Sequence, residues 1–383
     1  MRVDILANDK ASFIKPMADG LARMLKSCGA EPHLHYDGIE RLMRRPLIDA
    51  SSLRSFAGSS LRLRSTWKSL SRFVDRLEGT DLIVVVAHVP SSFSPKVLPN
   101  IELLRQIFPD VPIVNYDLIY LPSLESWSRA ILRDEPTGLA AENLAMFKRG
   151  KFGMERYDWY LLSSIGGYIP LENIRHPYSL IGIDIDDGRM YPDQKNFSVL
   201  VDFPQERGRF PEYREVQMEA LKIAGVNYEM LEGRYTRDEL LAVFRRSSVL
   251  LLAHSESFGL PICEAQACGC RILTPDPHWV TAHWLGKDYK TKRAPTLSSN
   301  FVTYRNDPES LAAELKRAQD SFNPQRVRET FEREQPEMLK GDREALADFL
   351  SRVQSGAINS QLHDSFLEIG RRSRSDQAHQ RIA

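Results

Sequence analysis

The chain has 383 residues, of which 42% are hydrophobic and 27% are charged, a composition that fits a globular protein with two domains of ordinary size. The 51 basic and 51 acidic residues cancel, so no overall charge attracts nucleic acid, and no apolar run approaches the length of a membrane-spanning helix. The N-terminus has no signal-peptide core, and we expect a cytoplasmic protein.

The first half of the chain alternates short apolar runs with helical stretches, which predicts parallel strands covered by helices. After the first strand, residues 8–12 lack the glycine-rich dinucleotide fingerprint, so we do not expect this half to hold a nucleotide. We assign residues 1–185 to a Rossmann-like N-terminal domain that binds the acceptor. Its expected strands are 3–7, 32–36, 81–87, 112–115 and 159–163, and its expected helices are 14–28 and 139–149.

Residues 41–76 form a basic segment with nine arginines and lysines but only two aspartates. Leucine, phenylalanine and tryptophan residues are interleaved with these charges, which fits an amphipathic helix. One interpretation is peripheral contact with the inner face of a membrane or with an anionic acceptor. The other is an ordinary solvated helix face.

A Gly-, Asp- and Pro-rich stretch over 181–192 indicates a linker, after which a second series of strands and helices begins. Thr236 and Glu239 form a capping-box pattern that predicts the start of a helix. We assign 186–352 to a C-terminal Rossmann-like domain and 353–383 to a polar tail. The expected strands are 197–203, 228–231, 249–253 and 271–274, and the expected helices are 213–224, 236–246 and 307–318.

Two glutamates, Glu256 and Glu264, lie eight positions apart where a short apolar run leads into a Gly/Pro turn and then a helix. Gly259 permits backbone angles and close approaches that a side chain would block, and Pro261 suits the first turn of a helix. The free N–H groups at the helix start would then face an anion such as a diphosphate. For Glu264 alone, the simpler alternative is an acid that the helix dipole favours early in a helix.

The string Phe258-Gly259-Leu260-Pro261 between the two glutamates resembles the Glu-x7-Glu signature of the retaining, nucleotide-sugar-dependent GT-B glycosyltransferases, the group-1, family-4-like enzymes. The resemblance implies an α/β fold of two Rossmann-like doubly wound domains facing a central cleft, with late helices, here 346–353, that cross back to the first domain. It also implies a UDP- or GDP-sugar donor in the second domain, a hydroxyl acceptor in the first, and neither metal nor other cofactor. Glu256 would be catalytic by holding the sugar hydroxyls, Glu264 would bind ribose, and the other donor-binding residues would be Ser257, Phe258, Gly259 and Leu260.

The cationic half of the donor site departs from the family pattern. The resemblance places an Arg and a Lys near the end of the first strand of the second domain, but the usual Gly-Arg and Lys-Gly pairs are absent there. The candidates are Arg207, Arg209 and Arg214, with Arg209 preferred because the neighbouring Gly208 lets a phosphate approach. Ordinary exposed arginines are the alternative.

Three residues of the first half are candidates at the expected carboxyl edge of its sheet, where ligands bind in open α/β folds. His88 follows the strand 81–87 and resembles the family's histidine at this position, so it is a candidate catalytic residue that would hydrogen-bond a sugar hydroxyl or the reacting region; a structural histidine is the alternative. Asp117 and Ser163 end neighbouring strands and are candidates for binding the acceptor.

Two other functions stay open at this point. A nucleotide-sugar epimerase of the same fold would also bind a nucleotide in the second half, and a non-catalytic carbohydrate-binding subunit would explain the atypical segment 207–214.

The cysteines Cys263, Cys268 and Cys270 do not predict a metal site, because no paired Cys/His motif elsewhere completes one. We expect them to be small apolar core residues.

Overall fold

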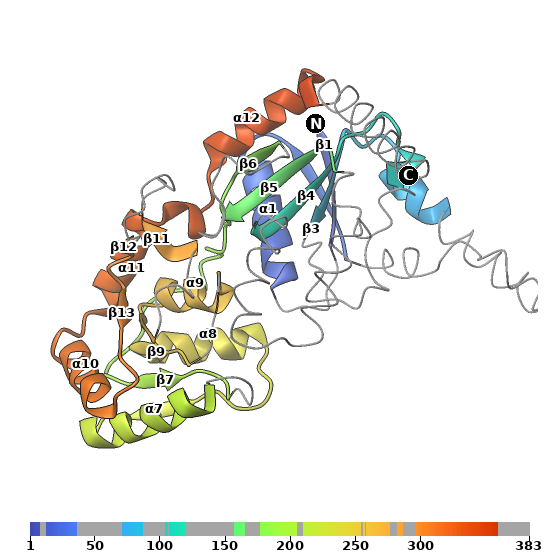
Figure 1. Ribbon diagram of the computed structural model, residues 1–383. Coiled ribbons are helices and arrows are strands. Elements are labelled where there is room, and N and C mark those ends of the chain that lie inside the picture. Colours follow the sequence, from blue (N-terminus) through green and yellow to red (C-terminus); the bar gives the residue numbers. More distant parts are fainter. Residues whose placement is uncertain are drawn as a thin grey trace, which may run out of the picture.

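The computed structural model describes residues 1–7, 13–36, 71–86, 104–105, 107–119, 157–164, 177–204, 210–253, 256, 258–275, 282–285 and 296–358. Within these ranges the chain forms two parallel sheets with helices packed against them (Figure 1). A small antiparallel pair, β11 (Trp284–Leu285) and β12 (Thr296–Leu297), lies outside both.

The first sheet has six parallel strands in the order β2-β1-β3-β4-β5-β6. Every residue of β3 and β5 is buried, as expected for strands with both faces covered. Helix α1, Ile14–Ser27, contacts β2 and β3 through its apolar face. The strands are β1 (Arg2–Leu6), β2 (Glu31–His35), β3 (Leu82–Val86), β4 (Ile113–Ile119), β5 (Trp159–Ser164) and β6 (Tyr178–Leu180).

The second sheet has five parallel strands in the order β13-β10-β9-β7-β8. Its helix α8 starts with the predicted capping box, in which Thr236 Oγ1 accepts from the Glu239 N–H and the Glu239 carboxylate accepts from the Thr236 N–H. The strands are β7 (Val199–Val201), β8 (Tyr228–Met230), β9 (Val249–Leu251), β10 (Arg271–Thr274) and β13 (Phe301–Thr303), and the helices α7 (Phe210–Ala224), α8 (Arg237–Arg246), α9 (Leu260–Ala267), α10 (Pro308–Asp320) and α11 (Pro324–Glu334).

The two sheets share one strand order. In each, the first strand lies between the second and the third, giving β2-β1-β3-β4-β5 in one sheet and β8-β7-β9-β10-β13 in the other. The winding therefore reverses between β1 and β3 and between β7 and β9, and ligands of doubly wound sheets bind at the carboxyl ends of strands beside such a point. Two Rossmann-like units are the architecture that the GT-B resemblance implies, so the predicted fold class is confirmed.

The C-terminal helices return to the first unit. After α11, the short helix η7, Pro336–Met338, runs beside the linker, where the Ile183 N–H donates to the Glu337 carbonyl at 2.7 Å. Helix α12, Arg343–Gln354, then contacts α1 and β6, and Figure 1 shows it lying against the first unit. The late helix thus crosses back as expected for residues 346–353.

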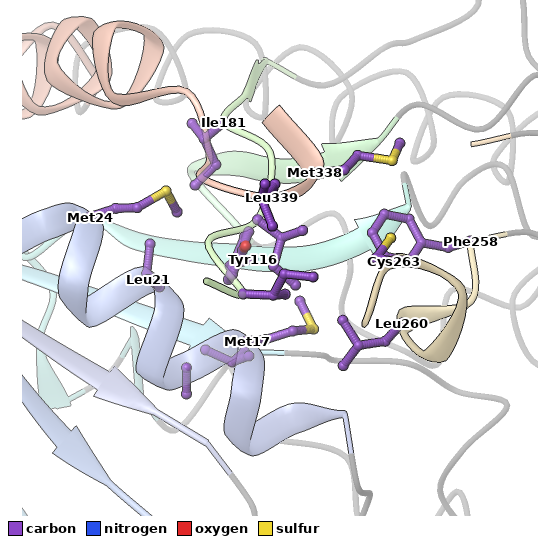
Figure 2. Packing of buried hydrophobic residues seen from close by; sticks show 14 of the residues in the cluster. Met17, Leu21, Met24, Tyr116, Ile181, Phe258, Leu260, Cys263, Met338 and Leu339 are labelled. Carbon is purple, nitrogen blue, oxygen red and sulfur yellow. The ribbon is translucent and has the colours of Figure 1, made fainter. Parts of the chain in front are cut away.

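Apolar side chains of both units form one buried cluster where the crossing segment, the linker and α9 meet. Gly20 of α1 lets the helix approach the linker closely, since a Cβ at this position would lie 2.0 Å from the Asp184 carbonyl oxygen. Figure 2 shows the members of the cluster near this contact: Met17, Leu21, Met24, Tyr116, Ile181, Phe258, Leu260, Cys263, Met338 and Leu339.

Several elements differ from the sequence prediction. The strand expected over 197–203 is only Val199–Val201, and the side chain of the next residue, Asp202, accepts from the Ala253 N–H just beyond β9. Strands β6 and β13 and helix α11 were not predicted. No helix in the described ranges is long and apolar enough to cross a membrane.

Candidate functional site

The turn between β9 and α9 lies at the carboxyl edge of the second sheet, beside its winding reversal. Gly259 is the N-cap of α9 and has left-handed backbone angles, φ 65° and ψ 83°. A Cβ at this position would lie 2.6 Å from Glu256 Cγ and 2.6 Å from Ile262 Cδ1. The backbone angles therefore favour glycine, and with no Cβ at this position the side chain of Glu256 packs directly over the helix start.

The N-terminus of α9 has no capping side chain. The first turn contains no acidic residue, and Pro261 lacks an N–H that would need a partner. The Ile262 and Cys263 N–H groups donate to the Gly259 carbonyl oxygen, so the positive end of the helix dipole, rather than a set of free N–H groups, is what favours an anion here. Glu256, which is partly buried, faces this end of the helix across Gly259.

Glu264 lies in the second turn of α9 and is only 3% exposed. Its Oε1 atom accepts a hydrogen bond from Arg237 Nε at 2.8 Å, and Arg237 Nη1 donates to Asp187 Oδ2 of the linker at 2.8 Å. Burial raises the pKa of Glu264, and the nearby guanidinium of Arg237 partly offsets this effect. The residue expected to bind ribose therefore already has a cationic partner, which the sequence motif did not indicate.

Asp187 joins the linker to this pair. Burial alone would raise its pKa, but hydrogen bonds from Arg189 and Arg237 outweigh burial and lower the pKa of Asp187 to about 2. The carboxylate therefore stays charged and holds Arg237 in place beside α9.

Asp202 connects the ends of β7 and β9 at the winding reversal. Its Oδ2 atom accepts from the Ala253 N–H at 2.8 Å, and its Oδ1 atom accepts from Arg214 Nη2 at 2.7 Å. The other terminal nitrogen, Arg214 Nη1, is buried without a hydrogen-bond partner among the residues described. Of the three arginines proposed from the sequence, Arg214 is thus held at the carboxyl edge by Asp202, and its Nη1 group is a donor without a partner among the described residues.

His283 contacts the turn and was missed by sequence reasoning. The imidazole is fully buried, with Nε2 2.7 Å from the Phe258 carbonyl oxygen and Nδ1 3.2 Å from Gln335 Oε1. No motif spans the 25 positions between Phe258 and His283, so only the folded chain reveals the contact.

Asp117 and Ser163 lie on opposite faces of the first sheet, although both were expected to bind the acceptor. Ser163 Oγ donates to Tyr116 Oη at 3.3 Å, and neighbouring residues of a strand point to opposite faces, so Asp117 faces away from this pair. Asp117 is fully buried, its Oδ2 atom has no partner within the described ranges, and burial raises its pKa to about 8. Asp117 is therefore a buried carboxyl with one unsatisfied oxygen among the described residues, whereas Ser163 contributes to internal hydrogen bonding.

Four candidates, His88, Arg207, Arg209 and Ser257, lie outside the described residues, as does the basic segment 41–76 except for 71–76. The cysteines Cys263, Cys268 and Cys270 are buried as expected, and burial raises the pKa of each thiol. Across the part of the chain that is described, no group of three or more His, Cys, Asp or Glu side chains is arranged to hold a metal.

A scan against protein-family models found no match, and a search of curated protein sequences found no significant match. Solved structures align over most of the chain. A putative UDP-N-acetylglucosamine 2-epimerase from Listeria monocytogenes aligns with a TM-score of 0.49 at 12% identity, covering 93% of this chain and 96% of that one. An α,α-trehalose 6-phosphate synthase from Burkholderia multivorans aligns with a TM-score of 0.46 at 13% identity, covering 95% of this chain and 98% of that one. The calicheamicin glycosyltransferase CalG4 aligns with a TM-score of 0.42 at 14% identity, covering 93% of this chain and 98% of that one. These TM-scores are too low to carry a functional assignment, which rests on the chain's own residues.

Proposed function

We propose that the protein is a glycosyltransferase that moves a sugar from a UDP- or GDP-sugar to a hydroxyl acceptor with retention of configuration. The observation that carries the proposal is the packing of Glu256 over the left-handed Gly259 at the uncapped N-terminus of α9. This arrangement places a carboxylate and an anion-binding helix end side by side at the carboxyl edge of the second sheet, next to its winding reversal.

Each group has a chemical task in this proposal. The N-terminus of α9 receives the donor diphosphate, and Arg214, held by Asp202, offers its unpaired Nη1 to the same charge. Glu256 accepts hydrogen bonds from hydroxyls of the donor sugar. Arg237 Nε holds Oε1 of the buried Glu264 at 2.8 Å, and the carboxyl oxygens of Glu264 accept from the ribose hydroxyls.

The transfer itself is a same-face displacement. The bond between the anomeric carbon and the phosphate oxygen breaks, the acceptor oxygen bonds to that carbon from the same side, and the acceptor proton passes to the departing phosphate. Positive charge on the protein that stabilises the leaving diphosphate provides much of the acceleration. The helix end and arginine supply this charge without a metal.

The proposal is tested by binding and turnover with purified protein. UDP, GDP and their sugars should raise the melting temperature, because a ligand that binds only the folded state stabilises it. In titration calorimetry, Glu264→Ala should weaken UDP or GDP binding, whereas Glu256→Ala should mainly lower the rate of nucleotide-sugar hydrolysis or transfer. Glu309→Ala, an exposed acid in the first turn of α10, is the matched control and should change neither quantity.

The same measurements separate the alternatives. An epimerase converts a labelled nucleotide sugar to its epimer without any acceptor, while a transferase does not. A non-catalytic subunit shows neither conversion nor transfer. If no nucleotide or nucleotide sugar shifts the melting temperature, donor binding by the second unit is wrong.

A further inference from the structure

His283 holds the turn on which the donor site is built. Its imidazole is 0% exposed and packs against the ring of Phe258, with ring centroids 6.3 Å apart, and against Phe301 at 5.0 Å. Nε2 lies 2.7 Å from the Phe258 carbonyl oxygen. A carbonyl only accepts hydrogen bonds, so the proton of the imidazole lies on Nε2.

The second ring nitrogen completes the arrangement. Burial lowers the pKa of His283, which favours the neutral ring, and a neutral ring with its proton on Nε2 accepts at Nδ1. The side-chain amide of Gln335, next to Nδ1, carries both a donor and an acceptor and can present its NH2 group there. Gln335 is itself 2% exposed, so it has little freedom to leave.

The hydrogen bond to the Phe258 carbonyl fixes a whole peptide plane. No peptide bond in the described ranges is cis, and in a trans peptide the C=O and the following N–H point in opposite directions. When the Phe258 carbonyl points at His283, the Gly259 N–H points away from it. The same plane sets the left-handed φ of 65° at Gly259, over which Glu256 packs.

We propose that His283 is a positioning residue that acts through Phe258, fixing the peptide before Gly259 and thereby the N-terminus of α9 on which donor phosphate and Glu256 depend. The role at the donor site rests on the function proposed above; the fixing of the turn does not. His283 also ties the turn to the interdomain crossing, because Gln335 ends α11 and immediately precedes η7, where the Glu337 carbonyl accepts from the linker residue Ile183.

Two substitutions separate the hydrogen bond from the volume of the ring. A glutamine places its amide nitrogen near the position of Nε2, and an asparagine places it near Nδ1. His283→Gln therefore keeps a donor for the Phe258 carbonyl, whereas His283→Asn loses it, while both lose the ring contacts with Phe258 and Phe301. A purely structural role of the ring predicts that the two variants behave alike.

The first measurement is amide hydrogen exchange over residues 256–264 without ligand. We expect about tenfold faster exchange in His283→Asn than in His283→Gln, because one buried hydrogen bond is worth about a factor of ten. Exchange in α12, which packs on α1 and β6 of the first unit, reports any global loss of stability and should be equal in the two variants. Equal exchange over 256–264 in both variants overturns the inference.

The second measurement is the dissociation constant of UDP and GDP, with kcat and KM for whichever nucleotide sugar the protein uses. His283→Asn should raise the dissociation constant about tenfold and His283→Gln by no more than about threefold. If the wild type binds no nucleotide, the proposed function fails, but the exchange comparison still decides the role of His283. If both variants fail to fold, Gln335→Met, which removes only the partner of Nδ1, replaces them and should accelerate exchange over 256–264 but not over α12.

Discussion

Arg237 Nε donates to Glu264 Oε1 at 2.8 Å, so α8 and α9 meet through a cation and a carboxylate of which the second is almost fully buried. Because Asp187 of the linker shares the same guanidinium, the linker and α9 are joined at one side chain. Under the proposed function, a nucleotide bound at Glu264 would also lie beside Arg237, the residue that holds the linker.

Arg237→Met should destabilise the protein more than Glu264→Gln. The first change leaves a buried carboxylate without its cation, while the second removes the charge that needs one. Removing one partner of a fully buried ion pair costs about 3–5 kcal/mol of stability. Because the Arg237 side chain is 23% exposed, we expect Arg237→Met to lower the free energy of unfolding by about 2 kcal/mol.

Urea denaturation of both single variants and the double variant measures this coupling. The double variant should lose less than the sum of the two single losses. A coupling energy near zero would show that the pair does not contribute to stability.

Asp187 makes the stability of the protein depend on pH at the acid end. Its folded-state pKa of about 2 lies below the usual 3.8, so its contribution is fully present above pH 3.8 and is lost as pH falls toward 2. Asp187→Asn should thus be less stable than wild type at pH 6 and approach it at low pH, with a change of about 2 kcal/mol between the two. Denaturation at pH 6, 3 and 2 tests this, with about half of the change expected by pH 3, and a constant difference would contradict the assignment.

Much of this architecture could be predicted from the sequence because the signals are local. The uninterrupted apolar run that becomes β3, the Thr236/Glu239 capping box and the turn before α9 each determine structure within a few residues. Helix α11 was missed even though Asn323 and Pro324 mark its start, because its sequence is strongly polar and its apolar stripe narrow.

The partners of the candidate residues could not be predicted, since they come from distant parts of the chain. Arg237 and Glu264 lie 27 positions apart, and His283 reaches both Phe258 and Gln335 across 25 and 52 positions. Asp117 and Ser163 lie near the carboxyl ends of the neighbouring strands β4 and β5, but β4 runs on to Ile119, so Asp117 lies within the strand and not after it. Strand pairing places the two side chains on opposite faces, so they do not share a rim.

Asp117→Asn should stabilise the protein at neutral pH while lowering its activity. The folded-state pKa of about 8 lies above the usual 3.8, so the ionisation of Asp117 costs the folded state nothing below pH 3.8 and destabilises it progressively as pH rises toward 8. Asparagine does not titrate, so the free energy of unfolding of the variant, relative to wild type, should increase as pH rises from 3.8 to 8. Thermal or urea unfolding at pH 5 and pH 8 measures the gain, and turnover measures the loss if the carboxyl binds the acceptor. A variant that gains no stability at pH 8 would place the Asp117 pKa near its usual value.

Gly259→Ala should remove activity at a modest cost in stability. Left-handed angles cost a non-glycine residue about 1–2 kcal/mol, and the atoms that a Cβ would meet, Glu256 Cγ and Ile262 Cδ1, belong to side chains that can move aside. Moving Glu256 off the helix start is the change that matters for donor binding.

Gly225→Ala is the matched control: its φ of 62° carries the same strain, but nothing lies within 4 Å of the added Cβ. Both variants should lose about the same stability in urea, and only Gly259→Ala should lose nucleotide-sugar turnover. Retained turnover in Gly259→Ala would mean that the position of Glu256 over the N-cap is not required for the reaction.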